Sequence, residues 1–592
     1  MPPKRPLKRR SEDEGRKQTK RTGKNKREQT YDTYDEALDG GVEMEEKGER
    51  YRDGDKNFMQ RPQSLKRLMT LRTIGKSKAS VDDEINANGI CDSARALYTL
   101  ATNFLLPPSS LPLLRESITL YQHATTLSNS PLLLMDVAFN LAQTFITLAD
   151  IMDDLRTVDD AEKDEAVLKL RNDAKITLAE VMDGQEAYLK TIAAQGNADA
   201  EEGEEVMEQI EGGAENQSME VDAGDKEEDE EGGNTSTWET HLPTPSTYID
   251  TVLALIDLHL LLWESTSTPQ PPTEEEQIAV RIILDRAASI APPGRQAELD
   301  LAEIKVLLTM DRIIWDMYKG EAKAGSGIEK SLDGAIAAIG TVLTSLDAVP
   351  AEDSTVRPEI LTTLADTHVT IANRLIFLNT QLPHGPSPLS QSAWAHLTQA
   401  TTHLISAVDS PTDANTPREF KPSVFLSLSK ISLARAKLAS VDDTAQRNVV
   451  QLFDNATTYA NRAGETLGWK LLRVGPVALS AGGTLSIGGG SIGGEDLPYP
   501  SGWDSELLGR NTALQQVRVC LYATRTELLP AESKGQYQRG LNKVLEKLGK
   551  IEVGERRITE KDVERWLGEV EDEEGCFDEI EKGWWTEVTA TL

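Results

Sequence analysis

Cysteine and aromatic residues are scarce in this chain of 592 residues. The three cysteines, Cys91, Cys520 and Cys576, lie far apart in the sequence. An odd number at such spacing indicates neither a disulfide framework nor a zinc site, so we expect a reducing compartment. Aromatic residues make up only 5% of the chain, which favours helices packed through alanine and leucine over an aromatic-rich sandwich. The composition therefore predicts an all-α fold.

Long hydrophobic runs are also missing. No uninterrupted apolar run approaches the roughly 18 residues of a membrane span. The first residues are basic, without the apolar stretch that follows the short basic end of a signal peptide. We therefore expect a soluble protein that is not secreted and has no membrane partner.

Motifs that carry chemistry are absent or incomplete. The glycines at 488–493 match the letters of a dinucleotide fingerprint, but the flanking sequence predicts neither the preceding strand nor the following helix. The seven histidines are scattered along the sequence. His396 and His403 could share a helix face, but no Cys or carboxylate completes a set of metal ligands. His368 stands where the repeated apolar pattern described below has an aromatic residue. No Ser or Cys stands in a nucleophile motif. We predict no enzyme, no catalytic residue, no metal and no cofactor.

Charge is distributed unevenly along the chain. The formal net charge is −34, yet residues 1–27 hold twelve Lys and Arg against three acids, which leaves the rest near −43 by difference. A body this acidic repels nucleic acid and attracts basic proteins. The partner class that charge favours is therefore a basic protein, such as a histone or a ribosomal protein.

The basic residues at the beginning form short, spaced clusters in a segment with almost no apolar residues, which predicts disorder. Such clusters are typical of a nuclear localisation signal and predict a nuclear or nucleocytoplasmic protein, although a nonspecific phosphate-binding tail is the alternative. The residues of the predicted signal are Lys4, Arg5, Lys8, Arg9, Arg10, Lys20 and Arg21.

A short apolar pattern returns at long intervals. Residues 97–104, 138–145 and 361–368 share a small or large apolar residue, then Leu-Ala three residues later, then an aromatic or histidine. Positions three and four apart share one helix face, so each segment gives a helix with one apolar stripe. The repetition predicts similar helices in both halves of the chain.

A second pattern follows the first. Residues 117–124, 280–287, 393–400 and 449–456 place small or apolar residues at i, i+4 and i+7, and three of the four end in Ala-Thr-Thr. The two patterns in order resemble the two helices of a tetratricopeptide unit, with alanine at the motif's glycine position. The alternative is a helix bundle rich in leucine and alanine.

The tetratricopeptide resemblance implies stacked helix pairs, because one pair cannot bury its apolar stripe alone. It implies a solenoid that binds a protein in its concave groove. The residues expected to pack between helices are Leu97, Leu100, Ala101, Phe104, Tyr121, Ala124, Leu141, Ala142, Phe145, Leu284, Ala287, Leu364, Ala365, Leu397, Ala400, Phe453 and Ala456.

Composition shifts divide the chain into six regions. Residues 57–92 lack an amphipathic stripe and read either as an insertion or as a misread exon, whereas 199–231 hold sixteen acids and one Lys. The regions are a basic disordered tail (1–35), a helical block with an irregular insertion at 57–92 (36–195), an acidic disordered loop (196–244), a second helical block (245–470), a Gly/Ser-rich loop (471–502) and a C-terminal helical cap (503–592).

The acidic loop is open to two interpretations. It is either a solvated spacer or an arm that captures a basic client. Its place between repeats is similar to that in histone chaperones of the nuclear autoantigenic sperm protein type, and the start MPPKRPL resembles fungal translation-termination enhancers, which are nuclear helical-repeat proteins. We predict a non-enzymatic scaffold, with an acidic chaperone as the alternative; the partner's identity and the oligomeric state are not indicated.

Overall fold

The computed structural model describes most of the chain after residue 82. The described residues are 83–155, 161–207, 242–265, 270–323, 356–380, 387–411, 416–469, 473–474, 487–488, 502–549, 558–574 and 579–590. They belong to one compact unit, Ser80–Leu592. The localisation signal in 1–35, residues 36–82, residues 208–241 of the acidic region, most of 471–502 and Cys576 lie outside the described residues.

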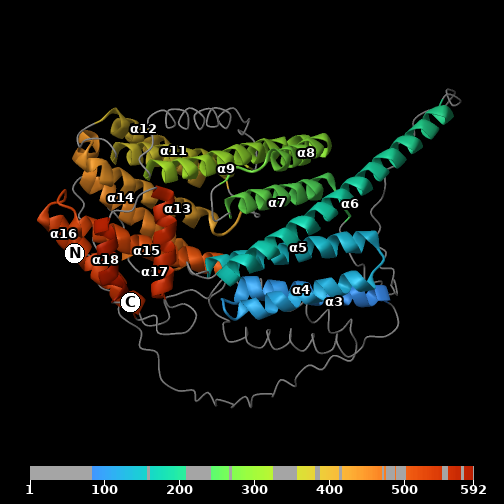
Figure 1. The fold of residues 1–592 in the computed structure, drawn as a ribbon, viewed down its shortest axis with the longest axis horizontal. Helices are drawn as coiled ribbons and strands as arrows, with labels where there is room; N and C mark the ends of the chain where they lie inside the picture. Colours follow the sequence, from blue (N-terminus) through green and yellow to red (C-terminus); the bar gives the residue numbers. More distant parts are fainter. Residues whose placement is uncertain are drawn as a thin grey trace, which may run out of the picture. The chain divides into compact units, whose positions relative to one another are not determined.

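The described residues are almost entirely helical, which confirms the all-α class. Neighbouring helices form antiparallel pairs that stack side by side, as in a helical-repeat solenoid (Figure 1). The helices are α3 (Asp83–Phe104), α4 (Ser110–Leu127), α5 (Pro131–Asp154), α6 (Ala161–Met207), α7 (Pro245–Glu264), α8 (Glu274–Ile290), α9 (Gln296–Lys323), α11 (Arg357–Thr380), α12 (Pro388–Asp409), α13 (Phe420–Lys437), α14 (Asp443–Leu467), α15 (Trp503–Arg525), α16 (Ala531–Gly549), α17 (Glu560–Glu574) and α18 (Glu579–Thr589).

Short elements complete the description. Two 3-10 turns, η2 (Pro293–Arg295) and η3 (Leu438–Ser440), adjoin α9 and α13. Two strands of two residues each, β1 (Arg473–Val474) and β2 (Ile487–Gly488), pair antiparallel within the region predicted as a Gly/Ser-rich loop.

Several helix ends are fixed by local sequence. Thr273 accepts a hydrogen bond from the backbone N–H of Glu276 at 3.3 Å, and the Glu276 carboxylate accepts from the Thr273 N–H at 2.8 Å. This reciprocal pair is a capping box at the start of α8. At the other end of a helix, Gly468 closes α14 with φ of 80°, a left-handed conformation that glycine adopts without steric cost.

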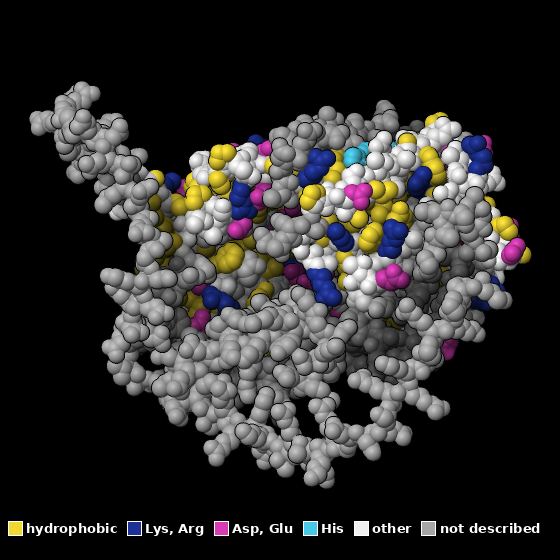
Figure 2. Space-filling view, turned by 180° about the vertical axis from the view of Figure 1, so that it is seen from behind, with side chains coloured by type: hydrophobic (Ala, Val, Ile, Leu, Met, Phe, Trp, Pro, Cys, Tyr) yellow, Lys and Arg dark blue, Asp and Glu magenta, His cyan; other side chains and the backbone are white. Residues whose placement is uncertain are grey.

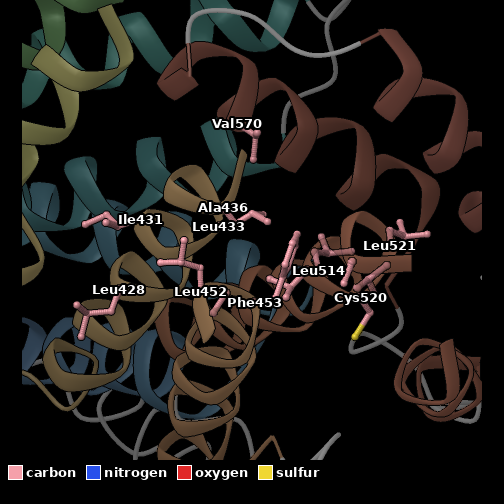
Figure 3. Close-up of a cluster of buried hydrophobic side chains, with 14 of the residues drawn as sticks. Leu428, Ile431, Leu433, Ala436, Leu452, Phe453, Leu514, Cys520, Leu521 and Val570 are labelled. Carbon is pink, nitrogen blue, oxygen red and sulfur yellow. The ribbon is translucent and has the colours of Figure 1, made fainter. Parts of the chain in front are cut away.

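The apolar faces gather in two large clusters. One lies among α3 to α9 and the other among α11 to α18. In the second, Figure 3 shows Leu428, Phe453 and Leu514 reaching into one interior from three helices. Phe453 is fully buried and its ring stacks near that of Tyr522, with centroids 6.4 Å apart. Each helix contributes a stripe that its neighbours cover, so no pair is independent of the stack.

Contacts between α9 and α11 link the two clusters. Leu301 and Ile304 of α9 pack with Leu364 of α11, and Trp315 packs edge-on against Phe377 with ring centroids 6.0 Å apart. A second link spans a long stretch of sequence, because the indole N–H of Trp503 on α15 donates to Asp154 of α5 at 2.7 Å. These contacts join the two helical blocks into the single described unit.

Two predicted boundaries are wrong. Helix α3 begins at Asp83, so residues 83–92 are helical although the sequence placed them in the irregular insertion. Helix α6 continues to Met207, past the predicted start of the acidic loop at 196. Figure 1 shows α6 extending well beyond its neighbours. The reason is that alanine and glutamate, which dominate 193–207, are strong helix formers in spite of their net charge.

Candidate interaction groove

Most of the residues expected to pack between helices are buried. Ala101, Ala142 and Ala365 are at most 1% exposed. Leu284 is partly buried against the first core cluster. The remaining buried members are Leu97, Leu100, Tyr121, Ala124, Leu141, Phe145, Ala287, Leu364, Leu397, Ala400, Phe453 and Ala456.

Phe104 is the exception, and its expected burial is wrong. Its side chain is 38% exposed. It is the last residue of α3, and the chain leaves the helix there before the bend at Pro107 and Pro108. Leu106, two residues further on, is 1% exposed and packs in the first core cluster instead. The end of the helix therefore places a leucine inside the core and leaves the motif's aromatic position at the surface.

A groove of about 410 Å³ opens between α7, α9 and α11. Each of the three helices supplies polar side chains to the groove. The lining residues are Asp257, Leu260, Leu261, Glu264, Lys305, Leu308, Thr309, Asp311, Arg312, Thr363, Asp366, Thr367, Thr370 and Arg374.

A buried ion pair forms one wall of the groove. The guanidinium of Arg374 donates to the Asp311 carboxylate at 2.6 Å and 3.2 Å, with side-chain exposures of 2% and 10%. The guanidinium also lies over the ring of Trp315, 4.7 Å from its centroid. Such a paired and stacked arginine is geometrically fixed, so this wall is held in place by the ion pair and the ring contact.

The other two cations of the groove also have carboxylate partners. Arg312 donates to Glu264 at 2.8 Å. Lys305 donates to Glu359 at 2.7 Å and lies 3.9 Å from Asp257. Each cation that lines the groove is thus already paired with at least one acid from a neighbouring helix.

Asp366 differs from the other acids of the groove. It is exposed, and its carboxylate makes no hydrogen bond or ion pair within the described part of the chain. Although the carboxylate reaches solvent, the protein atoms of the groove walls around it desolvate it and raise the pKa of Asp366 to about 6. The negative charge of Glu573 raises this pKa further, and the positive charges of Lys430 and Arg312 lower it. The groove therefore carries a carboxylate that no described cation pairs with directly.

Helix α17 closes one end of this surface. Asn373 of α11 donates to the backbone carbonyl of Glu573 at 2.7 Å, and Lys430 of α13 donates to the Glu573 carboxylate at 2.7 Å. Beyond them, Arg518 of α15 donates to Glu574 at 2.7 Å and to Glu581 at 2.6 Å. The C-terminal helices α17 and α18 thus pack against α11, α13 and α15.

On the face drawn in Figure 2, the described Lys and Arg side chains lie interspersed with Asp and Glu and with apolar side chains. Mixed charges of this kind are typical of a solvated surface. Among the described residues on this face, the acidic side chains are thus not gathered into one patch.

His368 of α11 meets two histidines of α12, His396 and His403. Nδ1 of His368 lies 2.9 Å from Nδ1 of His396, and the rings of His368 and His403 stack with centroids 5.5 Å apart. Burial lowers the pKa of His396. Among the residues that the structure describes, no group of three His, Cys, Asp or Glu is placed to hold a metal ion.

The two described cysteines, Cys91 and Cys520, are free and buried. Burial raises the pKa of each thiol to about 12, and charges around Cys91 add smaller effects. Thiols that stay protonated at neutral pH are poor nucleophiles.

Two helices, α5 and α7, are long and apolar enough to cross a membrane by length and composition. Neither helix is an uninterrupted apolar run, since α5 contains Asp136 and α7 contains Asp257. Both pack inside the stack, α5 against α4 and α6, and α7 against α6 and α9. Core helices pass the same compositional test because they are covered by protein on several sides.

No protein-family model and no curated protein matches the sequence. Among solved structures, the chain is similar to a circular tandem repeat protein of novel repeat topology, with 12% identity and a TM-score of 0.23 over 91% of this chain and 97% of that one. It is also similar to the S. pombe nuclear import adaptor Nro1 in two structures. One has 11% identity and a TM-score of 0.30 over 74% of this chain and 99% of Nro1. The other has 11% identity and a TM-score of 0.29 over 78% and 99%. Scores this low carry no argument about function, which has to come from the groove itself.

Proposed function

We propose that this protein is a non-enzymatic scaffold that binds a partner protein in the groove between α7, α9 and α11. The observation that carries the proposal is the groove itself, which three packed helices form and which presents charged and hydroxyl side chains to solvent. Rigid helices that hold a recessed polar surface are the usual means by which helical-repeat proteins recognise partners. The sequence motifs of catalysis are incomplete, and the proposal needs none.

The tetratricopeptide assignment is the finer part of this proposal. Its support is the pairing of successive helices and the burial of the alanines at the motif's small position, Ala101, Ala142 and Ala365. In such repeats a small residue lets neighbouring helices approach closely. The groove would then be the part of the concave surface that the C-terminal helices leave open.

A basic partner fits the charge of the chain. The net charge of −34 attracts basic proteins at long range, and this also keeps an acidic chaperone of histones or ribosomal proteins as the second candidate function. The two differ in salt dependence. Capture by the acidic region should weaken steeply at 0.5 M salt, where the Debye length is about 4 Å, whereas binding within a groove is screened less.

Filling the groove tests the proposal. Thr370 lines the groove and donates to the carbonyl of Asp366, while Thr402 makes the same kind of bond to Thr398 on the exposed side of α12. We expect Thr370→Trp to abolish recovery of the partner that the wild-type chain retains at 0.5 M salt, because the indole occupies the groove. Thr402→Trp is the matched control and should bind normally. The recovered partner is identified by mass spectrometry. Equal recovery by the wild-type chain and both variants would exclude the groove as the binding site.

The nuclear location is a separate proposal that rests on the basic clusters in residues 1–27. Deleting these residues should abolish nuclear accumulation of a fluorescent fusion, because the address is lost. The deletion should leave the thermal unfolding temperature unchanged, since almost no apolar residue is removed. An unchanged nuclear signal would assign the tail to nonspecific binding.

A further inference from the structure

We propose that the groove recognises an arginine or lysine side chain on an extended segment of the partner protein, held by Asp366. This inference rests on the proposed function and adds the chemistry of the partner to it. Three observations support it: the charges of the groove, a buried hydrogen-bond donor that has no acceptor, and the size of the groove.

The first step is the charge of the groove. Its three cations, Lys305, Arg312 and Arg374, each have a carboxylate partner within hydrogen-bonding distance. Asp366 has none among the described residues, and the charges on other elements that influence its pKa are those of Glu573 of α17, Lys430 of α13 and Arg312 of α9. Glu573 already binds Lys430. One negative charge is therefore left over, and a cation from outside would compensate it.

The second step is an unsatisfied donor in the same groove. Nε of Arg374 is buried and has no hydrogen-bond acceptor among the described residues, although the terminal nitrogens of its guanidinium bind Asp311. A buried donor without an acceptor is costly, and a carbonyl oxygen that reached Nε after a local shift of the groove wall would remove that cost. A peptide segment carries both complements, a cationic side chain for Asp366 and backbone carbonyls for such a donor.

The third step concerns size and surroundings. A volume of about 410 Å³ accommodates one long side chain with its flanking backbone. Thr363 and Thr370 line the groove, and each donates its hydroxyl proton to a carbonyl of its own helix. Their oxygens therefore remain acceptors for the N–H groups of a guanidinium or an ammonium. Thr363 and Thr370 lie three and four residues from Asp366, so both acceptors share its face of α11.

The test uses the full-length chain and a pair of labelled peptides. The probe is Ac-Ala-Ser-Ala-Arg-Ala-Ser-Ala with a fluorophore at its end, and the matched peptide carries citrulline, which keeps the shape of arginine without its charge. Fluorescence anisotropy gives both affinities. We expect the arginine peptide to bind about tenfold more tightly, as a charge-assisted hydrogen bond warrants. Asp366→Asn should bring the two affinities together, and Asp366→Glu should restore part of the preference.

The same titration at several pH values gives a second readout. The carboxylate of Asp366 is charged above its pKa of about 6 and protonated below it. The preference for arginine should therefore fall as the pH is lowered from 7.5 to 5, and Asp366→Asn should show no such change. Because the folded-state pKa is raised, ionised Asp366 opposes folding at neutral pH, so Asp366→Asn should be at least as stable as the wild type.

Two outcomes overturn the inference. One is a wild-type chain that binds the arginine and citrulline peptides equally, and the other is an Asp366→Asn variant that keeps the full preference. Either result leaves the scaffold proposal unaffected, because that proposal is tested separately by comparing Thr370→Trp with Thr402→Trp. Loss of partner recovery with Thr370→Trp but not with Asp366→Asn means that the groove binds its partner through other chemistry.

Discussion

Replacing Arg518 with methionine is expected to lower the free energy of unfolding by about 3–5 kcal/mol. The side chain is 1% exposed and lies between Glu574 and Glu581, to which it donates at 2.7 Å and 2.6 Å. Burial by itself raises the pKa of Glu581, but Lys437 and Arg518 lower it overall. Methionine fills similar space without the charge, so it leaves a buried carboxylate with Lys437 alone, 3.4 Å away.

Arg525→Met is the matched control for Arg518→Met. Arg525 lies on the same helix and pairs with Glu587 at 2.6 Å, but both side chains are largely exposed. Such a pair contributes about 1 kcal/mol or less. Urea unfolding followed by circular dichroism at pH 7 measures both variants. If the two lose equal stability, the buried network does not hold the C-terminal helices.

The charges of Glu574 and Glu581 also predict how the difference in stability between the wild type and Arg518→Met depends on pH. The pKa values of Glu574 and Glu581 are lowered in the folded protein. Their contribution is therefore complete above the ordinary glutamate pKa of about 4.3 and is lost as the pH falls below it. Without Arg518 the buried Glu581 can take up a proton at higher pH. The stability gap between wild type and variant should consequently narrow as the pH falls from 7 towards 4.

Replacing Phe453 with alanine is expected to cost about 3–5 kcal/mol, because it removes a whole ring from the core. Phe453 is fully buried, and its ring lies 6.1 Å from that of Tyr537 and 6.4 Å from that of Tyr522, measured between centroids. Three helices therefore lose packing at once. Thermal and urea unfolding should both register the change, with the far-ultraviolet spectrum of the folded state retained.

Phe104→Ala makes the same chemical change at a residue that is 38% exposed. A partly exposed ring has less surface to lose, so this variant should cost about 1 kcal/mol or less. A cost as large as that of Phe453→Ala would mean that Phe104 is packed as the repeat motif predicts, and the end assigned to α3 would then be wrong.

The sequence predicts what depends on neighbouring residues. Spacings of three and four residues indicate the helices and the buried alanines such as Ala142 and Ala400, and the Thr273 and Glu276 pair indicates the start of α8. These features depend on one turn of helix, which a single sequence contains. The helical class and most of the packing positions were accessible in this way.

The groove was not accessible from the sequence. Asp366 is influenced by Glu573, Lys430 and Arg312, which come from three other helices, and acids are too abundant in this chain for one of them to stand out. Arg374 and Asp311 are separated by 63 positions. Only the stacking of the helices brings them together. The contact of His368 with His396 and His403 could not be predicted for the same reason, because no spacing rule connects residues of α11 with residues of α12.

Site-specific photo-crosslinking tests most sharply whether the partner protein binds in the groove between α7, α9 and α11. A benzophenone amino acid is placed at Thr363, which lines the groove, or at Thr402 on the outer side of α12. We expect position 363 to crosslink the partner protein that is retained at 0.5 M salt, and position 402 not to crosslink it. A crosslink from 402 with none from 363 would contradict the claim that the groove between α7, α9 and α11 is the binding site.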